Sequence, residues 1–176
     1  PLEDNKILIS RVNSKTMYET KFIFIAAMNP CPCGNLLSSL KECRCNELEI
    51  QRYKNRLSEP FLDRIDLYVV MNDSFSDNKN IVSSSELHQN VIKAFIKQKK
   101  RGQKELNGKL NEEDIKKYCI LDEDAKEILE KARLNYQLSF RSINKVLKVA
   151  RTIADLNDNE IITKNDILKS LNFRRR

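Results

Sequence analysis

The sequence predicts an α/β segment over residues 1–73 and an all-helical domain over residues 85–176, joined by a polar linker at 74–84. Three observations support this fold class. A continuous apolar run fills residues 21–28, which is typical of a central strand in a parallel sheet. A group of four cysteines follows that run. From Ser85 onward, the apolar residues recur at helical spacing.

The composition fits a globular protein. The chain has 176 residues, of which 40% are hydrophobic and 32% are charged. No apolar run approaches the roughly 20 residues of a membrane span, and no secretory signal is visible. We therefore expect a cytoplasmic protein with no membrane partner. The chain begins on Pro1 rather than Met, from which we expect a piece of a longer protein.

The net charge of +7 is unevenly distributed. Residues 1–73 carry 10 Lys and Arg against 10 Asp and Glu, whereas residues 74–176 carry 22 against 15. Such an excess predicts a polyanionic partner for the second half. A solvated surface of Lys-rich helices explains it equally well.

A β-hairpin is predicted at the start of the chain. Residues 6–12 and 16–20 alternate as strands do, and residues 13–15 are typical of a turn. Arg11 and Lys15 lie near the tip, where they are candidate contacts to a phosphate backbone. The alternative is an ordinary polar hairpin tip.

Asn29 ends the apolar run 21–28. Ligands bind just past the carboxyl ends of parallel strands in α/β sheets, so this side chain is a candidate to orient a water molecule or a phosphate. The alternative is that it caps a turn. A second core strand is predicted over residues 65–71, where apolar and polar side chains alternate.

Four of the five cysteines form what we call the four-cysteine cluster: Cys31, Cys33, Cys43 and Cys45. Without a secretory signal, such spacing indicates a metal site rather than disulfides. Four thiolates suit tetrahedral zinc. The usual zinc knuckle is Cys-x2-Cys, so two Cys-x-Cys pairs are tighter than the standard, and reduced free thiols are the alternative. The fifth cysteine, Cys119, is predicted to be buried.

A helix capped by Asn46 is predicted to run to about residue 57, followed by a turn at 58–60. Arg64 comes next, between Asp63 and Asp66. A local ion pair is one interpretation of this junction. The other is an Arg presented to a phosphate on a neighbouring subunit.

The second half contains five predicted helices, four of which begin at the caps Asn111, Asp122, Ser139 and Thr163. They span residues 85–101, 111–119, 122–135, 139–156 and 163–171, and residues 103–110 form a polar loop.

Two basic features of these helices have a structural and a functional interpretation. The basic run 97–101 complements a helix dipole or contacts DNA. Arg141 lies in a first turn, where the dipole disfavours a cation. An anionic partner would explain it, and a solvated surface Arg is the alternative.

Three strings make the chain resemble one family along its length: Ala26-Ala-Met-Asn-Pro-Cys-Pro-Cys-Gly34, Leu62-Asp-Arg-Ile-Asp66 and Val149-Ala-Arg-Thr-Ile-Ala-Asp155. The chain resembles the C-terminal part of the ComM/YifB proteins, bacterial AAA+ ATPases related to magnesium chelatase. The string around the first two cysteines is the most distinctive.

The resemblance implies a partial AAA+ core with a hairpin, two core strands and a Cys-rich insert, followed by a helical lid. It implies that Asn29 is the sensor 1 residue, which positions the attacking water near the γ-phosphate. It makes Arg64 the arginine finger that reaches the ATP of the adjacent subunit. Arg141 would be the sensor 2 residue on the lid, and Arg11 and Lys15 would lie on a hairpin that faces a central channel.

Family members resemble hexameric ring helicases that drive branch migration of DNA during recombination of taken-up DNA. The resemblance therefore implies ATP, Mg²⁺, DNA and a homo-oligomeric ring for the parent protein.

The nucleotide site is incomplete in this chain. An AAA+ enzyme needs a Walker A loop and a Walker B carboxylate. The three glycines, Gly34, Gly102 and Gly108, form no G-x-x-x-x-G-K-[ST] pattern, so we expect both motifs upstream of Pro1. We expect no ATP hydrolysis from this chain alone, and we expect self-association through an exposed sheet edge.

Two other functions stay open at this point. One is a zinc-stabilised helical module that binds nucleic acid or protein without enzymatic activity. The other is a chelatase-type AAA+ subunit that acts on a tetrapyrrole-metal enzyme.

Overall fold

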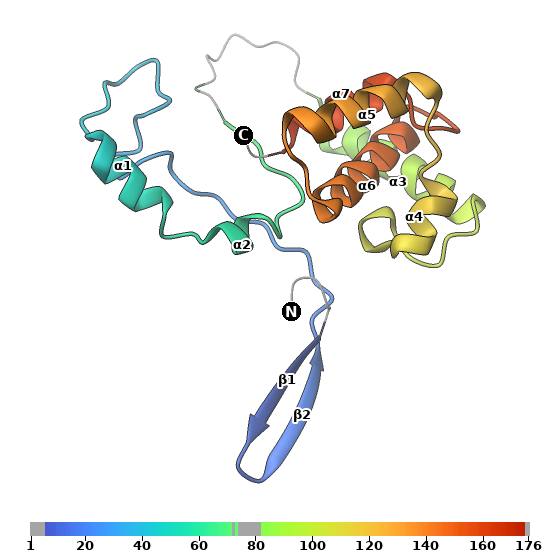
Figure 1. The fold of residues 1–176 in the computed structure, drawn as a ribbon, viewed down its shortest axis with the longest axis horizontal. Helices are drawn as coiled ribbons and strands as arrows, with labels where there is room; N and C mark the ends of the chain where they lie inside the picture. The colour runs from blue at the N-terminus through green and yellow to red at the C-terminus, as the bar shows by residue number, and fades with distance from the viewer. Residues whose placement is uncertain (1–5, 72, 74–81, 175–176) are drawn as a thin grey trace. The chain divides into compact units, whose positions relative to one another are not determined.

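The computed structural model describes residues 6–71, 73 and 82–174 (Figure 1). The chain divides into two compact units. The first comprises Pro1–Ile65 with Met71–Ser74, and the second comprises Asp66–Val70 with Phe75–Arg176. Most of the predicted linker, residues 74–81, lies outside the described residues.

The predicted hairpin is confirmed. β1 (Lys6–Arg11) and β2 (Ser14–Glu19) pair antiparallel in a register that places Arg11 opposite Ser14. The turn between them holds only two residues, so β2 begins two residues earlier than predicted. Every residue of both strands is exposed. The hairpin is therefore stabilised by the hydrogen bonds between its strands rather than by packing against a core.

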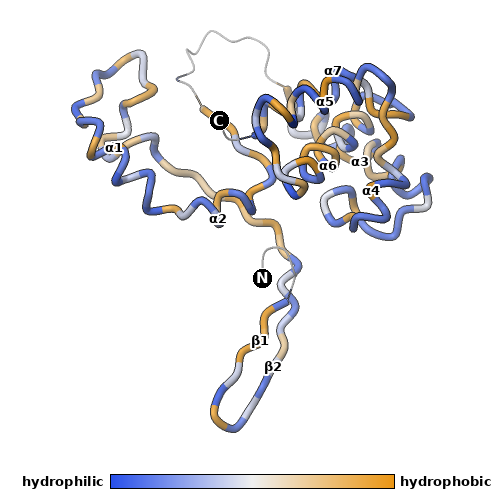
Figure 2. Tube along the Cα trace, in the orientation of Figure 1, coloured by the Kyte–Doolittle hydropathy of each residue, from blue (hydrophilic) through white to orange (hydrophobic). Residues whose placement is uncertain are grey.

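The prediction of core strands at 21–28 and 65–71 is wrong for this structure. The hairpin is the only sheet in the described part of the chain. A strand needs a neighbour that shares its ladder hydrogen bonds, and no described segment provides one for either run. Ile23 and Ile25 are consequently 87% and 88% exposed, and Figure 2 shows apolar colouring along the tube that follows β2.

The helix predicted after the four-cysteine cluster is confirmed, although it ends at Lys54 rather than near residue 57, and a second short helix begins within the predicted turn at 58–60. α1 (Glu47–Lys54) begins with a capping box, in which the Asn46 side chain accepts from the Glu49 N–H at 2.9 Å. The Glu49 carboxylate in turn accepts from the Asn46 N–H at 3.0 Å. α2 (Glu59–Leu62) carries its proline in the first turn, where no N–H is needed.

The second unit is helical, and its predicted caps are confirmed. Asn111, Asp122 and Ser139 each accept a hydrogen bond from the backbone amide three residues on, and Thr163 is the N-cap residue of the last helix. The elements are α3 (Ser84–Lys100), η1 (Asn107–Lys109), α4 (Glu112–Tyr118), α5 (Glu123–Asn135), α6 (Phe140–Leu156) and α7 (Lys164–Asn172).

The core of this unit forms around α6, which contacts α3, α4, α7 and η1 (Figure 1). Its buried face carries Val146, Ala150 and Ala154. These side chains pack in one cluster with Ile162 and Ile167, both fully buried. Cys119 belongs to the same cluster, which confirms its predicted burial.

A polar network lies beside this core. The Arg151 guanidinium is fully buried, and its Nε and one terminal nitrogen donate to Asp155 Oδ1 at 3.2 and 2.9 Å. Asn107 donates to the other carboxylate oxygen of Asp155 at 2.8 Å, and Arg101 donates to this carboxylate as well. Because buried charges are costly unless paired, this network fixes how η1 and α3 sit on α6.

Among the described residues, no helix has both the length and the apolar character needed to cross a membrane.

Candidate functional site

The four-cysteine cluster is brought together as predicted. The sulfur of Cys31 lies 3.4 Å from that of Cys33 and 3.7 Å from that of Cys43, and the Cys33 and Cys43 sulfurs are 3.6 Å apart. With Cys45, all four sulfurs lie within 4.8 Å of one another. Zinc–sulfur bonds of about 2.3 Å in a tetrahedron place the sulfurs about 3.8 Å apart. The donor set therefore fits a tetrahedral metal ion.

Disulfides do not account for these distances. A disulfide would bring two sulfurs to about 2.05 Å, and all five cysteines are free. A site with four cysteine ligands is closed to substrate, which is typical of structural rather than catalytic zinc.

Local turns position the thiols. The N–H of Gly34 donates to the Cys31 carbonyl at 3.0 Å, and Gly34 has a φ of +83°. Glycine adopts this left-handed backbone conformation readily because it has no Cβ. On the far side of the loop, Asp73 accepts from the Ser38 hydroxyl at 2.7 Å and from the Ser39 amide at 2.9 Å. These hydrogen bonds join positions 34 and 35 residues apart, so no local sequence pattern predicts them.

The electrostatics of the cluster favour thiolate formation at one position. Backbone amides of Asn35 and Arg44, followed by the thiol of Cys31, lower the pKa of Cys33 to about 6. For Cys45, a backbone hydrogen bond from Cys33 lowers the pKa, but desolvation and the neighbouring thiols outweigh it and raise that pKa to about 12. A bound cation favours the thiolate form of every ligand.

The Asn29 side chain lies close to Gly34, the residue that follows Cys33. A Cβ built on Gly34 would meet the Asn29 side-chain nitrogen at 3.7 Å and its Cγ at 3.8 Å. The amide is exposed, so it stays accessible to a ligand. The sequence did not predict this proximity, although Asn29 precedes Cys31 by only two positions.

Arg64 lies in the turn that follows α2 and is half-buried. Its guanidinium donates to the carbonyl of Pro60, and its N–H donates to the Phe61 carbonyl at 3.0 Å. The Phe61 ring packs edge-on against Phe24 at 6.0 Å between centroids. This contact links the turn that carries Arg64 to the apolar segment that ends at Asn29.

Arg141 belongs to the helical unit, where it is exposed in the first turn of α6. The string 149–155, which carries part of the family resemblance, has a structural explanation here. Within it, Arg151 and Asp155 form the buried ion pair. Their spacing of four residues inside an apolar helical stripe is the signal that could have identified the pair from the sequence.

Arg11 and Lys15 flank the exposed hairpin tip. No ion pair is found for either residue within the described ranges, and Val12 between the strands is fully exposed. The tip is therefore accessible to an anionic partner.

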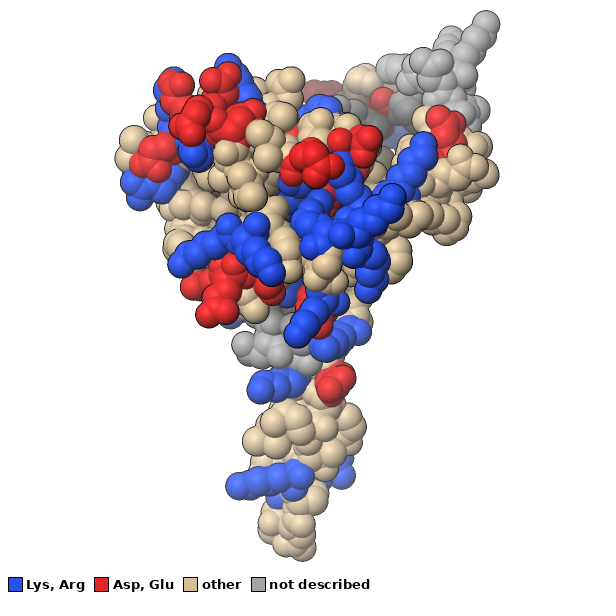
Figure 3. Space-filling model, turned by 90° about the vertical axis from the view of Figure 1, so that its right-hand side faces the viewer, with Lys and Arg blue, Asp and Glu red and all other residues tan. Residues whose placement is uncertain are grey.

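The basic end of α3 has structural partners. Lys97 pairs with Asp158 at 2.9 Å and with Glu160 at 3.4 Å, and Arg101 pairs with Asp155. These contacts favour the structural interpretation for those two cations. On the face of the molecule drawn in Figure 3, Lys and Arg side chains lie among Asp and Glu side chains.

Comparison with protein families gives two adjacent matches. Residues 1–79 match the model of the family described as magnesium chelatase, subunit ChlI. Residues 82–174 match the model described as magnesium chelatase, subunit ChlI C-terminal.

Comparison with individual proteins gives relatives that align over almost the whole chain. The chain is 36% identical to the uncharacterized protein YifB of Salmonella typhimurium and 36% identical to YifB of Escherichia coli. It is 35% identical to the competence protein ComM of Haemophilus influenzae. In each case, 99% of this chain aligns with 35% of the relative, so the chain spans about a third of the length of these proteins.

Proposed function

This chain belongs to the magnesium-chelatase-related ComM/YifB family, and on that premise we propose that it is the C-terminal part of an AAA+ ATP hydrolase that remodels DNA. The observation that carries the proposal is the order of the two family matches. A core-type segment is followed directly by the family's C-terminal domain, as in a motor whose nucleotide site is completed by a helical lid.

In this proposal, three side chains serve the nucleotide. Asn29 orients the attacking water, and its exposed amide beside Gly34 supports that role. Arg64 stabilises the charge that develops on the γ-phosphate of a neighbouring subunit. The hydrogen bond from its guanidinium to the Pro60 carbonyl supports a fixed orientation of the side chain. Arg141 contacts the phosphates from the lid.

The arginine finger is the most testable of these roles. In the full-length protein, Arg64→Ala should reduce the ATP turnover number by about 10³-fold or more while ATP binding is retained. Arg133→Ala is the matched control, because Arg133 is exposed on α5 and pairs locally with Glu130. Hydrolysis that survives Arg64→Ala would eliminate the arginine-finger role.

DNA is the proposed substrate, and the hairpin is the proposed contact. Arg11 and Lys15 lie at an exposed tip where phosphates can approach. The name of the Haemophilus influenzae relative, a competence protein, supports an association with DNA. If the tip contacts phosphates, the affinity for DNA should fall steeply with salt, and Arg11→Gln with Lys15→Gln should flatten that dependence.

We further propose that the four-cysteine cluster holds one structural Zn²⁺. The sulfur distances of 3.4–3.7 Å support this ion. Elemental analysis of the purified chain should give about one zinc per chain, and Cys31→Ser should remove it. A metal-free chain with five titratable thiols would contradict the proposal.

A chelatase-type AAA+ subunit is the second candidate, because the matching families are described as magnesium chelatase. Stimulation of the full-length ATPase by DNA separates the two. DNA-stimulated turnover supports the DNA motor, and turnover indifferent to DNA favours the chelatase type.

A further inference from the structure

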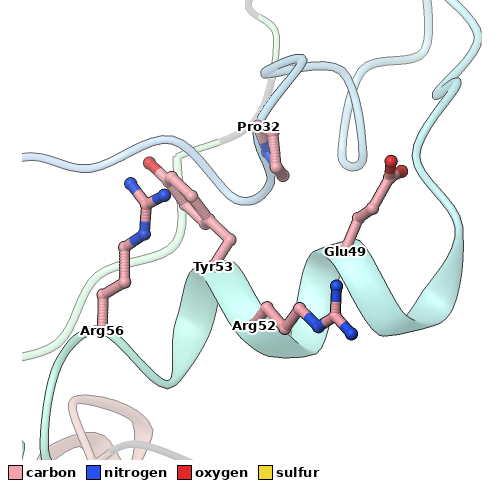
Figure 4. A pocket seen from close by; sticks show the side chains of 5 residues that line it. All are labelled: Pro32, Glu49, Arg52, Tyr53 and Arg56. Carbon is pink, nitrogen blue, oxygen red and sulfur yellow. The ribbon is translucent and has the colours of Figure 1, made fainter.

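A pocket of about 400 Å³ lies between the four-cysteine cluster and α1. Pro32 forms one wall, and the other lining residues are Glu49, Arg52, Tyr53 and Arg56 (Figure 4). Its volume falls in the range of about 300–1,000 Å³ that is usual for small organic ligands. None of these residues has a role in the nucleotide site or the hairpin described above.

The two arginines of the pocket have no carboxylate partner among the described residues. The Arg56 guanidinium lies 5.9 Å from the centroid of the Tyr53 ring, within the range of a cation–π contact. Arg52 lies on α1 and Arg56 lies in the turn just after it, and both are exposed and line the pocket beside Tyr53. Two cations thus flank a half-buried aromatic ring.

The remaining lining residues restrict what binds inside. Pro32 faces the α1 side of the pocket and presents an apolar ring (Figure 4). One oxygen of the Glu49 carboxylate accepts from the Asn46 N–H at 3.0 Å, which keeps this anion at the pocket. A carboxylate repels a phosphate, so the pocket favours an uncharged planar group inside and phosphates at the arginine rim.

We propose that this pocket binds one nucleotide of a single-stranded nucleic acid, with the base against Tyr53 and Pro32 and the flanking phosphates at Arg52 and Arg56. Aromatic stacking beside cations is how proteins hold single strands without base pairing. This site would be where the proposed DNA substrate binds as a single strand, so the inference rests on the proposed DNA function. An acidic peptide suits the pocket less well, because Glu49 repels its carboxylates and nothing in such a peptide uses the ring.

The test measures binding of the chain to a fluorescein-labelled oligo-dT of about 16 nucleotides, a length at the upper end of single-strand sites. Fluorescence anisotropy reports the affinity across a range of salt concentrations. Tyr53→Leu, which removes the ring but keeps apolar bulk, should weaken binding by about fivefold or more, and Tyr53→Phe should bind like the parent chain.

The double change of Arg52→Gln and Arg56→Gln removes two phosphate contacts. It should reduce the slope of log affinity against log salt by about 1.4. Lys126→Gln with Lys131→Gln is the matched control, because these lysines are exposed on α5 and the change in charge is the same. Far-UV circular dichroism checks that each variant is folded, and the exposed arginines keep the test valid if Tyr53→Leu does not fold.

Several results would overturn the site. The first is unchanged binding by both a folded Tyr53→Leu variant and the arginine double variant. The second is that the Lys126 and Lys131 control weakens binding as much as the arginine double variant does. The third is that poly-glutamate displaces the oligonucleotide as effectively as unlabelled oligo-dT does. If the Arg11 and Lys15 variant loses binding while the pocket variants do not, this site fails and the proposed DNA function stands. A chain that binds no oligonucleotide contradicts the site as well, while ATP turnover by the full-length protein tests the motor separately.

Discussion

Replacing Asp155 by Ala should destabilise the helical unit by about 3–5 kcal/mol, because the change leaves a buried guanidinium without its carboxylate. Arg151 and the Asp155 side chain are both fully buried in their ion pair. After the change, Arg151 keeps its hydrogen bonds to the carbonyls of Glu160 at 2.8 Å and Asn159 at 2.7 Å. These dipoles replace only part of the lost charge.

The magnitude follows from the number of partners that lose their acceptor. Asp155 accepts from Arg151, Arg101 and Asn107. A hydrogen bond to a charged group contributes roughly 1.5–3 kcal/mol, and such contributions do not add when they share one group. The paired change Arg151→Met with Asp155→Leu should therefore cost less than Asp155→Ala alone, since it removes both charges.

Urea unfolding followed by far-UV circular dichroism measures this effect. With a slope of about 2 kcal/mol per molar urea, a loss of about 4 kcal/mol lowers the midpoint by about 2 M. Glu127→Ala is the control, because Glu127 forms an exposed pair with Lys131 and should cost less than about 1 kcal/mol. An Asp155→Ala midpoint that matches the control would refute the reasoning.

The remaining predictions concern the stability of the helical unit at low pH and the retention of zinc by the four-cysteine cluster. Burial raises the pKa of Asp166, but hydrogen bonds from the Thr163 cap and two asparagine amides together lower it. The Asp166 carboxylate therefore contributes its full stabilisation above the unfolded-state pKa of about 3.9, and this stabilisation is lost as the pH falls through the lower folded-state pKa. Asp166→Asn should flatten the pH dependence of the unfolding free energy in that window. An unchanged pH profile would contradict this prediction. Gly34→Ala should weaken zinc retention in a chelator competition by roughly 1–2 kcal/mol, because its φ of +83° strains any residue with a Cβ, whereas Gly102→Ala, with a φ of +75° outside the cluster, should leave retention unchanged.

The local features of the fold were predictable because their causes lie within a few residues. The caps at Asn111, Asp122 and Ser139 hydrogen-bond to amides three positions away, so the sequence alone contains the information. The apolar run 21–28 is different, because a strand forms only beside a partner.

Buried polar residues were the main omission in the helical unit. The segment 103–110 has a polar composition that predicts a loop on the surface, yet Gln103 and Asn107 are buried. Their amides bond to each other at 3.0 Å, and the Asn107 N–H donates to Gln98 at 3.1 Å. Polar side chains are stable in a core when every group is paired, and the pairing depends on tertiary structure that periodicity does not describe.

In the candidate site as well, features with a local cause were predictable and features that depend on the loop path were not. The spacing of the four cysteines was sufficient to predict that they meet, because the sequence separations are short. The proximity of Asn29 to Gly34 and the pocket beside Tyr53 depend on the path of the loop, which no pattern of residue types specifies.

Mixing two variants of the full-length protein tests most directly whether Arg64 acts on the nucleotide of a neighbouring subunit. One variant carries Arg64→Ala with an intact nucleotide site, and the other keeps Arg64 but has its own nucleotide site disabled. Each should be inactive alone, and an equal mixture should recover turnover at about a quarter of the sites, where an intact site meets an intact Arg64 in a randomly assembled ring. A mixture that stays as inactive as its components would contradict the account.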